Sequence, residues 1–292
     1  MSGLRIDHVT VAGSDLNRLG ARFADRGLPA EYGGPHSNGI THMALLGFAD
    51  GSYLELISTI RPDAESPVWD RHIRGDGGPA AWAVQVEEIR AEAERLRSAG
   101  IPVSGPAPWH RVRPDGRRIE WELAFPGRGP PGSSLPFLIQ DLTSRHLRVS
   151  PSAALAGTEL TGVAAVVLGA REPRSAAAAL QRAYGWDPPE IAPAPALGAT
   201  AARFAGTPVH LLSPAGGGSW LAARLERFGE SPCAFLLGSR DLGESARRFA
   251  LEGVEPDTSL GTPVLWLERP DGEGCLHGIG VTSVDRGPPP GA

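Results

Sequence analysis

The chain has 292 residues, of which 41% are hydrophobic and 21% charged, so it can form one large or two ordinary globular domains and is too apolar for wholesale disorder. Its formal net charge of −5 argues against a general nucleic-acid binder, and no apolar run approaches the roughly 20 residues of a membrane span. All 28 basic residues are arginine, and the lack of lysine excludes Schiff-base enzymes and P-loop nucleotide sites.

The two cysteines, Cys233 and Cys275, form neither a disulfide framework nor a zinc cluster. The first residues contain no hydrophobic segment of the kind that signal peptides carry. We therefore expect a cytoplasmic protein without nucleic-acid or membrane partners.

The first sixty residues predict a strand, a helix and then further strands. Residues 6–12 are rich in β-branched side chains and predict a strand. Ser14 or Asp15 can cap the following helix, whose apolar residues recur at helical spacing. Two later strands, 41–48 and 52–58, are joined by an Asp-Gly hairpin turn. The order is β-α-β-β-β, in which the first strand after the helix is poorly defined.

The same order returns three more times along the chain. Residues 51–58 resemble residues 206–213, and the sequence around Val9 resembles the sequence around Trp82. The later units are predicted over residues 80–140, 159–214 and 233–283, with a linker containing proline and alanine at 148–158.

Three segments of the first half carry a resemblance to a known family. They are Asp7-His8-Val9, Gly33-Gly34-Pro35-His36-Ser37-Asn38-Gly39-Ile40-Thr41-His42, and Asp50-Gly51-Ser52-Tyr53-Leu54-Glu55-Leu56-Ile57. Together with four β-α-β-β-β units in two pairs, they resemble the vicinal oxygen chelate superfamily of glyoxalases, bleomycin-resistance proteins and extradiol dioxygenases. Within that superfamily the sequence is most similar to the glyoxalase-like domain proteins.

The resemblance implies an α+β fold in which tandem βαβββ modules form two glyoxalase-like domains with half-open, mixed β-sheet barrels. The expected boundaries are an N-terminal domain over 1–147, a linker over 148–158, a degenerate C-terminal domain over 159–284 and a flexible tail over 285–292. A homodimer is a further expectation from the family.

The resemblance also implies a divalent metal ion (Zn, Fe, Mn, Co or Ni) held by His8 and Glu55, because a module of this family offers one ligand from its first strand and one from its last. Imidazole and carboxylate groups suit these ions. In the second module Ala81 takes the position of His8. We expect a third ligand from His42, if strand alternation turns it inward, or from His36.

Three residues are expected to bind substrate: His36 in a glycine-rich loop at the rim of the cleft, and Trp121 and Gln140 on the facing sheet. Four arginines surround a predicted Pro-Asp-Gly turn, and they either clamp a carboxylate or phosphate of the ligand or form a solvated hairpin tip. They are Arg111, Arg113, Arg117 and Arg118.

The second half of the chain lacks equivalent ligands. Val163 stands at the position of His8, and His210 stands at the position of Glu55. One histidine cannot hold a metal ion, so we expect this half to serve packing, oligomerisation or as a lid. The ligand is expected in the N-terminal half.

Two functions fit these residues. One is a metal-dependent lyase or isomerase that acts on a small oxygenated metabolite, with the ion as Lewis acid and Glu55 as ligand, base or both. The other is a non-catalytic protein that binds and sequesters a small molecule, as bleomycin-resistance proteins do. The missing ligands of the second module favour the binding protein, whereas His8 and Glu55 favour the enzyme.

Overall fold

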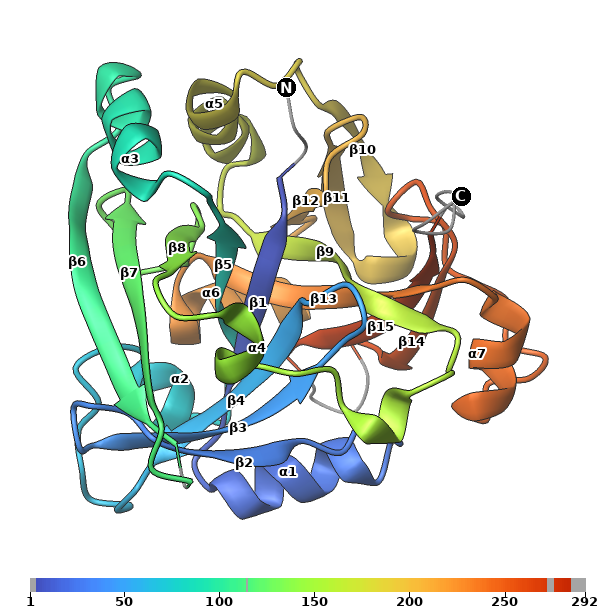
Figure 1. Ribbon diagram of the computed structural model, residues 1–292. Helices are drawn as coiled ribbons and strands as arrows, with labels where there is room; N and C mark the ends of the chain where they lie inside the picture. Colours follow the sequence, from blue (N-terminus) through green and yellow to red (C-terminus); the bar gives the residue numbers. More distant parts are fainter. Residues whose placement is uncertain (1–3, 114, 272–275, 285–292) are drawn as a thin grey trace, which may run out of the picture.

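The computed structural model describes residues 4–113, 115–271 and 276–284, and it consists of two curled, mixed β-sheets of eight and seven strands (Figure 1). The α+β fold of tandem strand-helix-strand units is thereby confirmed. The expected flexible tail, 285–292, and Cys275 lie outside the described residues. No helix in the described ranges has both the length and the apolar character needed to cross a membrane.

The first sheet has the strand order β2-β3-β4-β1-β5-β8-β7-β6. Its strands are β1 (Ile6–Ala12), β2 (Glu31–Pro35), β3 (Thr41–Gly47), β4 (Tyr53–Thr59), β5 (Gly78–Gln85), β6 (Val103–Val112), β7 (Arg118–Pro126) and β8 (Phe137–Asp141). The helices of this part are α1 (Leu16–Ala24), α2 (Asp70–Arg74), α3 (Ile89–Ser98) and α4 (Arg145–Arg148), followed by the 3-10 turn η1 (Ala153–Leu155).

The second sheet has the strand order β10-β11-β12-β9-β13-β15-β14. Its strands are β9 (Leu160–Gly169), β10 (Glu190–Ala194), β11 (Ala199–Arg203), β12 (Val209–Pro214), β13 (Ser231–Ser239), β14 (Val264–Glu268) and β15 (Gly278–Ser283). The accompanying elements are α5 (Pro173–Tyr184), η2 (Pro195–Leu197), α6 (Trp220–Phe228) and α7 (Leu242–Arg248). Among the described residues, the fourth unit has one strand fewer than the βαβββ pattern predicts.

Each sheet is built from two halves with matching topology. In the first sheet β1 pairs antiparallel with β5, while β4 runs parallel to β1 and β8 runs parallel to β5. In the second sheet β9, β13, β12 and β15 repeat this arrangement. The repeated units that the sequence predicts in pairs are therefore present as the two halves of each sheet, related by a pseudo-twofold axis.

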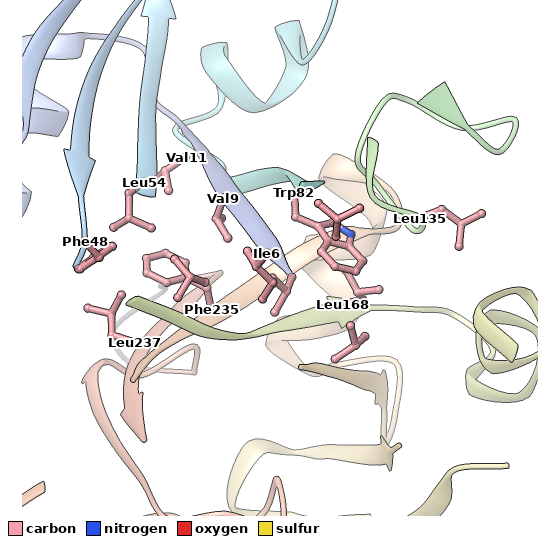
Figure 2. Close-up of a cluster of buried hydrophobic side chains, with 14 of the residues drawn as sticks. Ile6, Val9, Val11, Phe48, Leu54, Trp82, Leu135, Leu168, Phe235 and Leu237 are labelled. Atoms are coloured by element: carbon pink, nitrogen blue, oxygen red, sulfur yellow. The ribbon is translucent and has the colours of Figure 1, made fainter. Parts of the chain in front are cut away.

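The two sheets share one apolar core. Strand alternation turns Val9 of β1 and Trp82 of β5 toward β9 and β13, where they pack with Val166 and Phe235 (Figure 2). These side chains are almost completely buried. The opposite face of the first sheet is therefore left free to surround a cavity.

The second sheet uses its opposite face differently. Leu197 of η2, Leu225 of α6 and Trp266 of β14 pack against it in a second apolar cluster. This cluster fills the face of the second sheet that corresponds to the cavity-lining face of the first.

One equivalence between the halves was predicted wrongly. His210 lies beside Val167 in the second sheet, where Glu55 lies beside Thr10 in the first. The position of His8 is therefore taken by Ala165 rather than Val163. The reason is that β9 follows β1 by 157 residues (Thr10 to Val167), whereas β12 follows β4 by 155 (Glu55 to His210), so a single offset misplaces one strand of the pair; Val163 lies in the shared core.

We predict that Trp82→Ala lowers the free energy of unfolding by about 3–5 kcal/mol, because it opens a cavity between the sheets. Trp82→Phe is the matched control: it keeps an aromatic ring and removes an indole N–H that has no hydrogen-bond partner among the described residues. Chemical denaturation measures both. A loss below about 1 kcal/mol in Trp82→Ala would contradict the shared core.

Candidate active site

The first sheet encloses a cavity of about 190 Å³. Every residue that lines it lies between His8 and Arg148. Its walls are mostly apolar and include Met43, Ile57 and Trp121. An apolar cavity of about 150 Å³ is large enough for benzene, so this one has room for a single small organic molecule.

The alternation of the strands explains which side chains reach the cavity. In β4, Tyr53, Glu55 and Ile57 point inward, and the neighbouring Leu54 and Leu56 belong to the core. Cross-strand partners share a face, and β6 and β7 accordingly bring Trp109 and Trp121 together on the cavity wall.

The two outer strands of the first sheet lie close together. Arg111 of β6 donates a hydrogen bond from Nη1 to the backbone oxygen of Gly33 in β2. A second bond, 2.6 Å long, runs from Nη2 of Arg111 to the backbone oxygen of Arg148. These bonds link the edges of the sheet on one side of the cavity.

One end of the cavity is polar, and Glu55 is its centre. The carboxylate oxygen Oε1 lies 3.3 Å from Nε2 of His36, and Oε2 accepts a 3.0 Å hydrogen bond from the hydroxyl of Thr10. Nε2 of His8 lies 3.9 Å from Oε2. Two imidazoles and a hydroxyl therefore face one buried carboxylate.

These neighbours keep Glu55 ionised. Burial alone would raise the pKa of Glu55, but the hydrogen bond and charge of His36, the charge of His8 and the hydrogen bond from Thr10 outweigh it and lower the pKa to about 2. The cavity therefore contains a permanent negative charge at physiological pH.

The rings of His8 and His36 are each held by a contact at Nδ1. Nδ1 of His8 lies 2.7 Å from a carboxylate oxygen of Asp7, and Nδ1 of His36 lies 2.9 Å from the hydroxyl of Thr41. In both rings Nδ1 is engaged and Nε2 faces Glu55. Such outer partners fix the orientation of histidines that bind metals or transfer protons.

Asp7 is itself held by a buried ionic cluster. It is fully buried and accepts hydrogen bonds from Arg148, at 2.8 and 3.0 Å, and from Arg145. Asp141 pairs with both arginines. Burial acts to raise the pKa of Asp7, but Arg148 and His8 hold it well below its usual range.

The structure brings four of the predicted site residues to one cavity. His8, Glu55 and His36 lie at its polar end and Trp121 lies on its wall. His36 was expected either at the rim as a contact for the ligand or, as an alternative to His42, as the third metal ligand, and it lies beside Glu55.

Two predicted site residues lie elsewhere. His42 was expected to turn inward, but Thr41 and Met43 line the cavity, so the alternation of β3 places His42 on the opposite face, where its ring packs edge-on against Tyr32. Gln140 also faces away, because Phe137 and Ile139 of β8 point inward. Its side-chain oxygen accepts a 2.8 Å hydrogen bond from the backbone of Ile89 at the start of α3.

Other residues around the polar end were not predicted. Thr10 donates a hydrogen bond to Glu55, and the ring of Tyr53 stacks on that of His8; both are ordinary strand residues whose contacts no sequence pattern indicates. Arg111 was one of four arginines for which a solvated hairpin tip was the slightly favoured interpretation, whereas in the structure its side chain is buried.

The donor types at the polar end suit a divalent cation, since two imidazoles and one carboxylate are common ligands of first-row metals. The positions of these side chains, however, are not those of a formed metal site. Within the described part of the chain, no three His, Cys, Asp or Glu side chains form a group that could hold a metal ion as they stand. The oxygens of Glu55 are instead engaged with His36 and Thr10.

We predict that Asp7→Asn lowers the free energy of unfolding by about 3–5 kcal/mol, because it leaves Arg148 and Arg145 buried beside a neutral group. Glu120→Gln is the matched control, since it removes a carboxylate from an exposed pair with Arg118 and should cost about 0–1 kcal/mol. Urea denaturation compares the two variants. Equal losses of unfolding free energy in the two variants would show that the buried ionic cluster does not stabilise the fold.

We also predict a pH dependence from Glu55. Its pKa falls from 4.5 in a model peptide to about 2 in the fold, so the ionised carboxylate stabilises the protein above about pH 4.5 and this stabilisation is lost as the pH falls toward 2. The difference in unfolding free energy between wild type and Glu55→Gln should shrink over that interval, as measured by denaturation at several pH values. A difference that stays constant to pH 2 would contradict the assigned contacts.

Comparison with known proteins agrees with this geometry. Residues 6–184 match the model of a family described as a glyoxalase-like domain. Among solved structures, a hypothetical protein from Staphylococcus aureus has a TM-score of 0.63 at 13% identity, covering 96% of this chain and 100% of that one. No curated protein sequence matches the chain.

Two further structures share the fold. A variant of 4-hydroxymandelate synthase from Streptomyces coelicolor has a TM-score of 0.62 at 16% identity, covering 97% of this chain and 93% of that one. A Mn(II)-bound glyoxalase from Novosphingobium aromaticivorans has a TM-score of 0.55 at 13% identity, and the match covers 96% of this chain and 81% of the glyoxalase. At these sequence identities, the similarity shows that the proteins share a fold and nothing more. Because the family model matches more than half of the sequence, the chain belongs to the glyoxalase-like domain family.

Proposed function

We propose that the cavity binds a small, largely apolar molecule by an oxygen-bearing group at its polar end, and that His8, His36 and Glu55 hold a divalent cation there. The activity proposed is that of a lyase or isomerase. The observation that carries this proposal is the ionised, buried Glu55 facing two oriented imidazoles in an otherwise apolar cavity.

The low pKa of Glu55 favours a particular role for it. A carboxylate whose pKa is about 2 is a poor proton acceptor at neutral pH, because an efficient general base has a pKa near the working pH. A permanent negative charge is, however, well suited to attract and hold a cation. In this proposal Glu55 serves to bind the cation, since its carboxylate faces the Nε2 atoms of both imidazoles.

The donor set has the composition that such a cation requires. A divalent ion bound there would supply Lewis acidity toward an oxygen of the ligand. The protein's own contributions are the orientation of the imidazoles by Asp7 and Thr41 and the exclusion of water by the apolar wall. The Mn(II)-bound glyoxalase that shares the fold supports the choice of cation class.

A second candidate is a non-catalytic binding protein. It is favoured by Ala81, which stands where the symmetry of the sheet would place a counterpart of His8 and offers no ligand. The apolar wall is compatible with either function. The two differ in whether ligand binding requires the cation.

The proposed cation is tested by metal analysis of protein purified without a histidine tag. We expect about one equivalent of a divalent transition metal in the wild type and a loss of at least tenfold in affinity for Glu55→Gln, since changes even to the outer partners of metal ligands cost roughly 10–100-fold.

His42→Gln is the matched control, because His42 lies on the opposite face of β3 and its loss should leave the metal content unchanged. Wild-type protein that binds no metal at any supply level would eliminate the metal-dependent enzyme and leave the binding protein. An equal loss of metal in His42→Gln and Glu55→Gln would contradict the assigned ligands.

A further inference from the structure

Arg111 is a buried cation on the wall of the cavity. It projects inward from β6, beside Trp109, and its exposed fraction is 5%. Its hydrogen bonds go to the backbone oxygens of Gly33 and Arg148. Among the residues that the structure describes, it forms no ion pair with a carboxylate.

Two other buried arginines have more hydrogen-bond or ion-pair partners than Arg111. Arg148 is paired with both Asp7 and Asp141. Arg224, which joins α6 to the segments around β5 and β13, donates to four backbone oxygens, two from each Nη atom. Among the described residues, Arg111 has one such bond from each Nη atom, and the residue lines the cavity.

A guanidinium in this position lacks nearby compensation for its charge. An arginine stays protonated in proteins, and a buried charge is costly unless it is paired and hydrogen-bonded. Burial lowers the pKa of Arg111, while Tyr53 and Glu55 act to raise it, although the carboxylate of Glu55 lies beyond ion-pair distance. Within the described ranges the other N–H groups of Arg111 have no hydrogen-bond partner, so they can receive an anion that enters the cavity.

The surroundings of Arg111 restrict the kind of anion. Trp109, Trp121 and Leu123 lie on the same wall, so the body of the ligand must be apolar or aromatic. The planar fork of a guanidinium matches a carboxylate in two parallel hydrogen bonds. A phosphate would bring up to two negative charges and require more donors than this apolar wall offers.

We propose that Arg111 binds the carboxylate of the ligand and that the cavity therefore selects small organic acids with an apolar or aromatic body over their neutral counterparts. This inference rests on the proposed function only in that the cavity is the small-molecule site. It does not depend on whether a cation is bound at Glu55.

The test compares two probes of nearly the same size and shape, the anionic 3-phenylpropanoate and the neutral 3-phenylpropanamide. Trp69, Trp109 and Trp121 line the cavity, so their fluorescence reports binding without a label. The full-length wild type should bind the carboxylate roughly 10- to 100-fold more tightly than the amide, as expected for hydrogen bonds to a charged group.

In Arg111→Met this preference should fall to within about threefold, while the affinity for the amide stays within about threefold of wild type. Because Arg111 also links β6 to β2, Arg111→Gln is the second variant: it removes the charge and keeps an N–H donor for Gly33. Circular dichroism confirms that each variant is folded.

Arg113→Met is the matched control. Arg113 lies two residues further along the same hairpin, donates to the backbone oxygen of Leu147 and pairs with Asp115. It does not line the cavity. The preference for the carboxylate should survive in this variant.

Equal affinity of the wild type for the two probes would overturn the assignment to Arg111 and leave the cavity as a binding site. A folded Arg111→Gln or Arg111→Met that keeps the wild-type preference would overturn it as well. If neither probe binds to the wild type, the proposed function fails together with this inference.

Discussion

The central constraint in this protein is that β1 is buried on both faces. Val9 and Val11 pack into the core between the two sheets, while His8 and Thr10 face the cavity. Because successive side chains of a strand point to opposite faces, the packing that joins the sheets also fixes where His8 points. Asp7 adds to this by anchoring Nδ1 of His8 to a buried cluster with Arg148. The stability of the core and the geometry of the site are therefore consequences of the same strand.

The two sheets show what the same topology does with and without a polar site. In the first sheet, the face turned away from the core carries Glu55, His36 and Arg111 around a cavity. In the second, the corresponding face is covered by apolar side chains, with Ala165 in place of His8. An unpaired buried polar group costs about 1–3 kcal/mol, so polar residues persist inside a sheet only where something compensates them. The carboxylate ligand that we propose for the first sheet would provide such compensation for Arg111.

Much of this structure could be predicted from the sequence, and the errors have physical causes. Repeats and hydrophobic alternation predicted both sheets and their internal symmetry, and the motifs around His8 and Glu55 named two residues that meet. A one-residue error in strand register exchanges the two faces of a strand, which is why His42 and Gln140 were placed inward. Arg111 depends on the meeting of β2 and β6, two strands far apart in the chain, which no local pattern shows.

The most direct test of this account is a crystal structure of the protein grown with Mn²⁺, in which an anomalous difference map locates the ion without assumptions about its ligands. The account predicts one peak inside the first sheet, in contact with Glu55 and with the imidazoles of His8 and His36, and none at the second sheet. A peak at His210, or side chains of His8 and Glu55 turned to opposite faces of the first sheet, would contradict it.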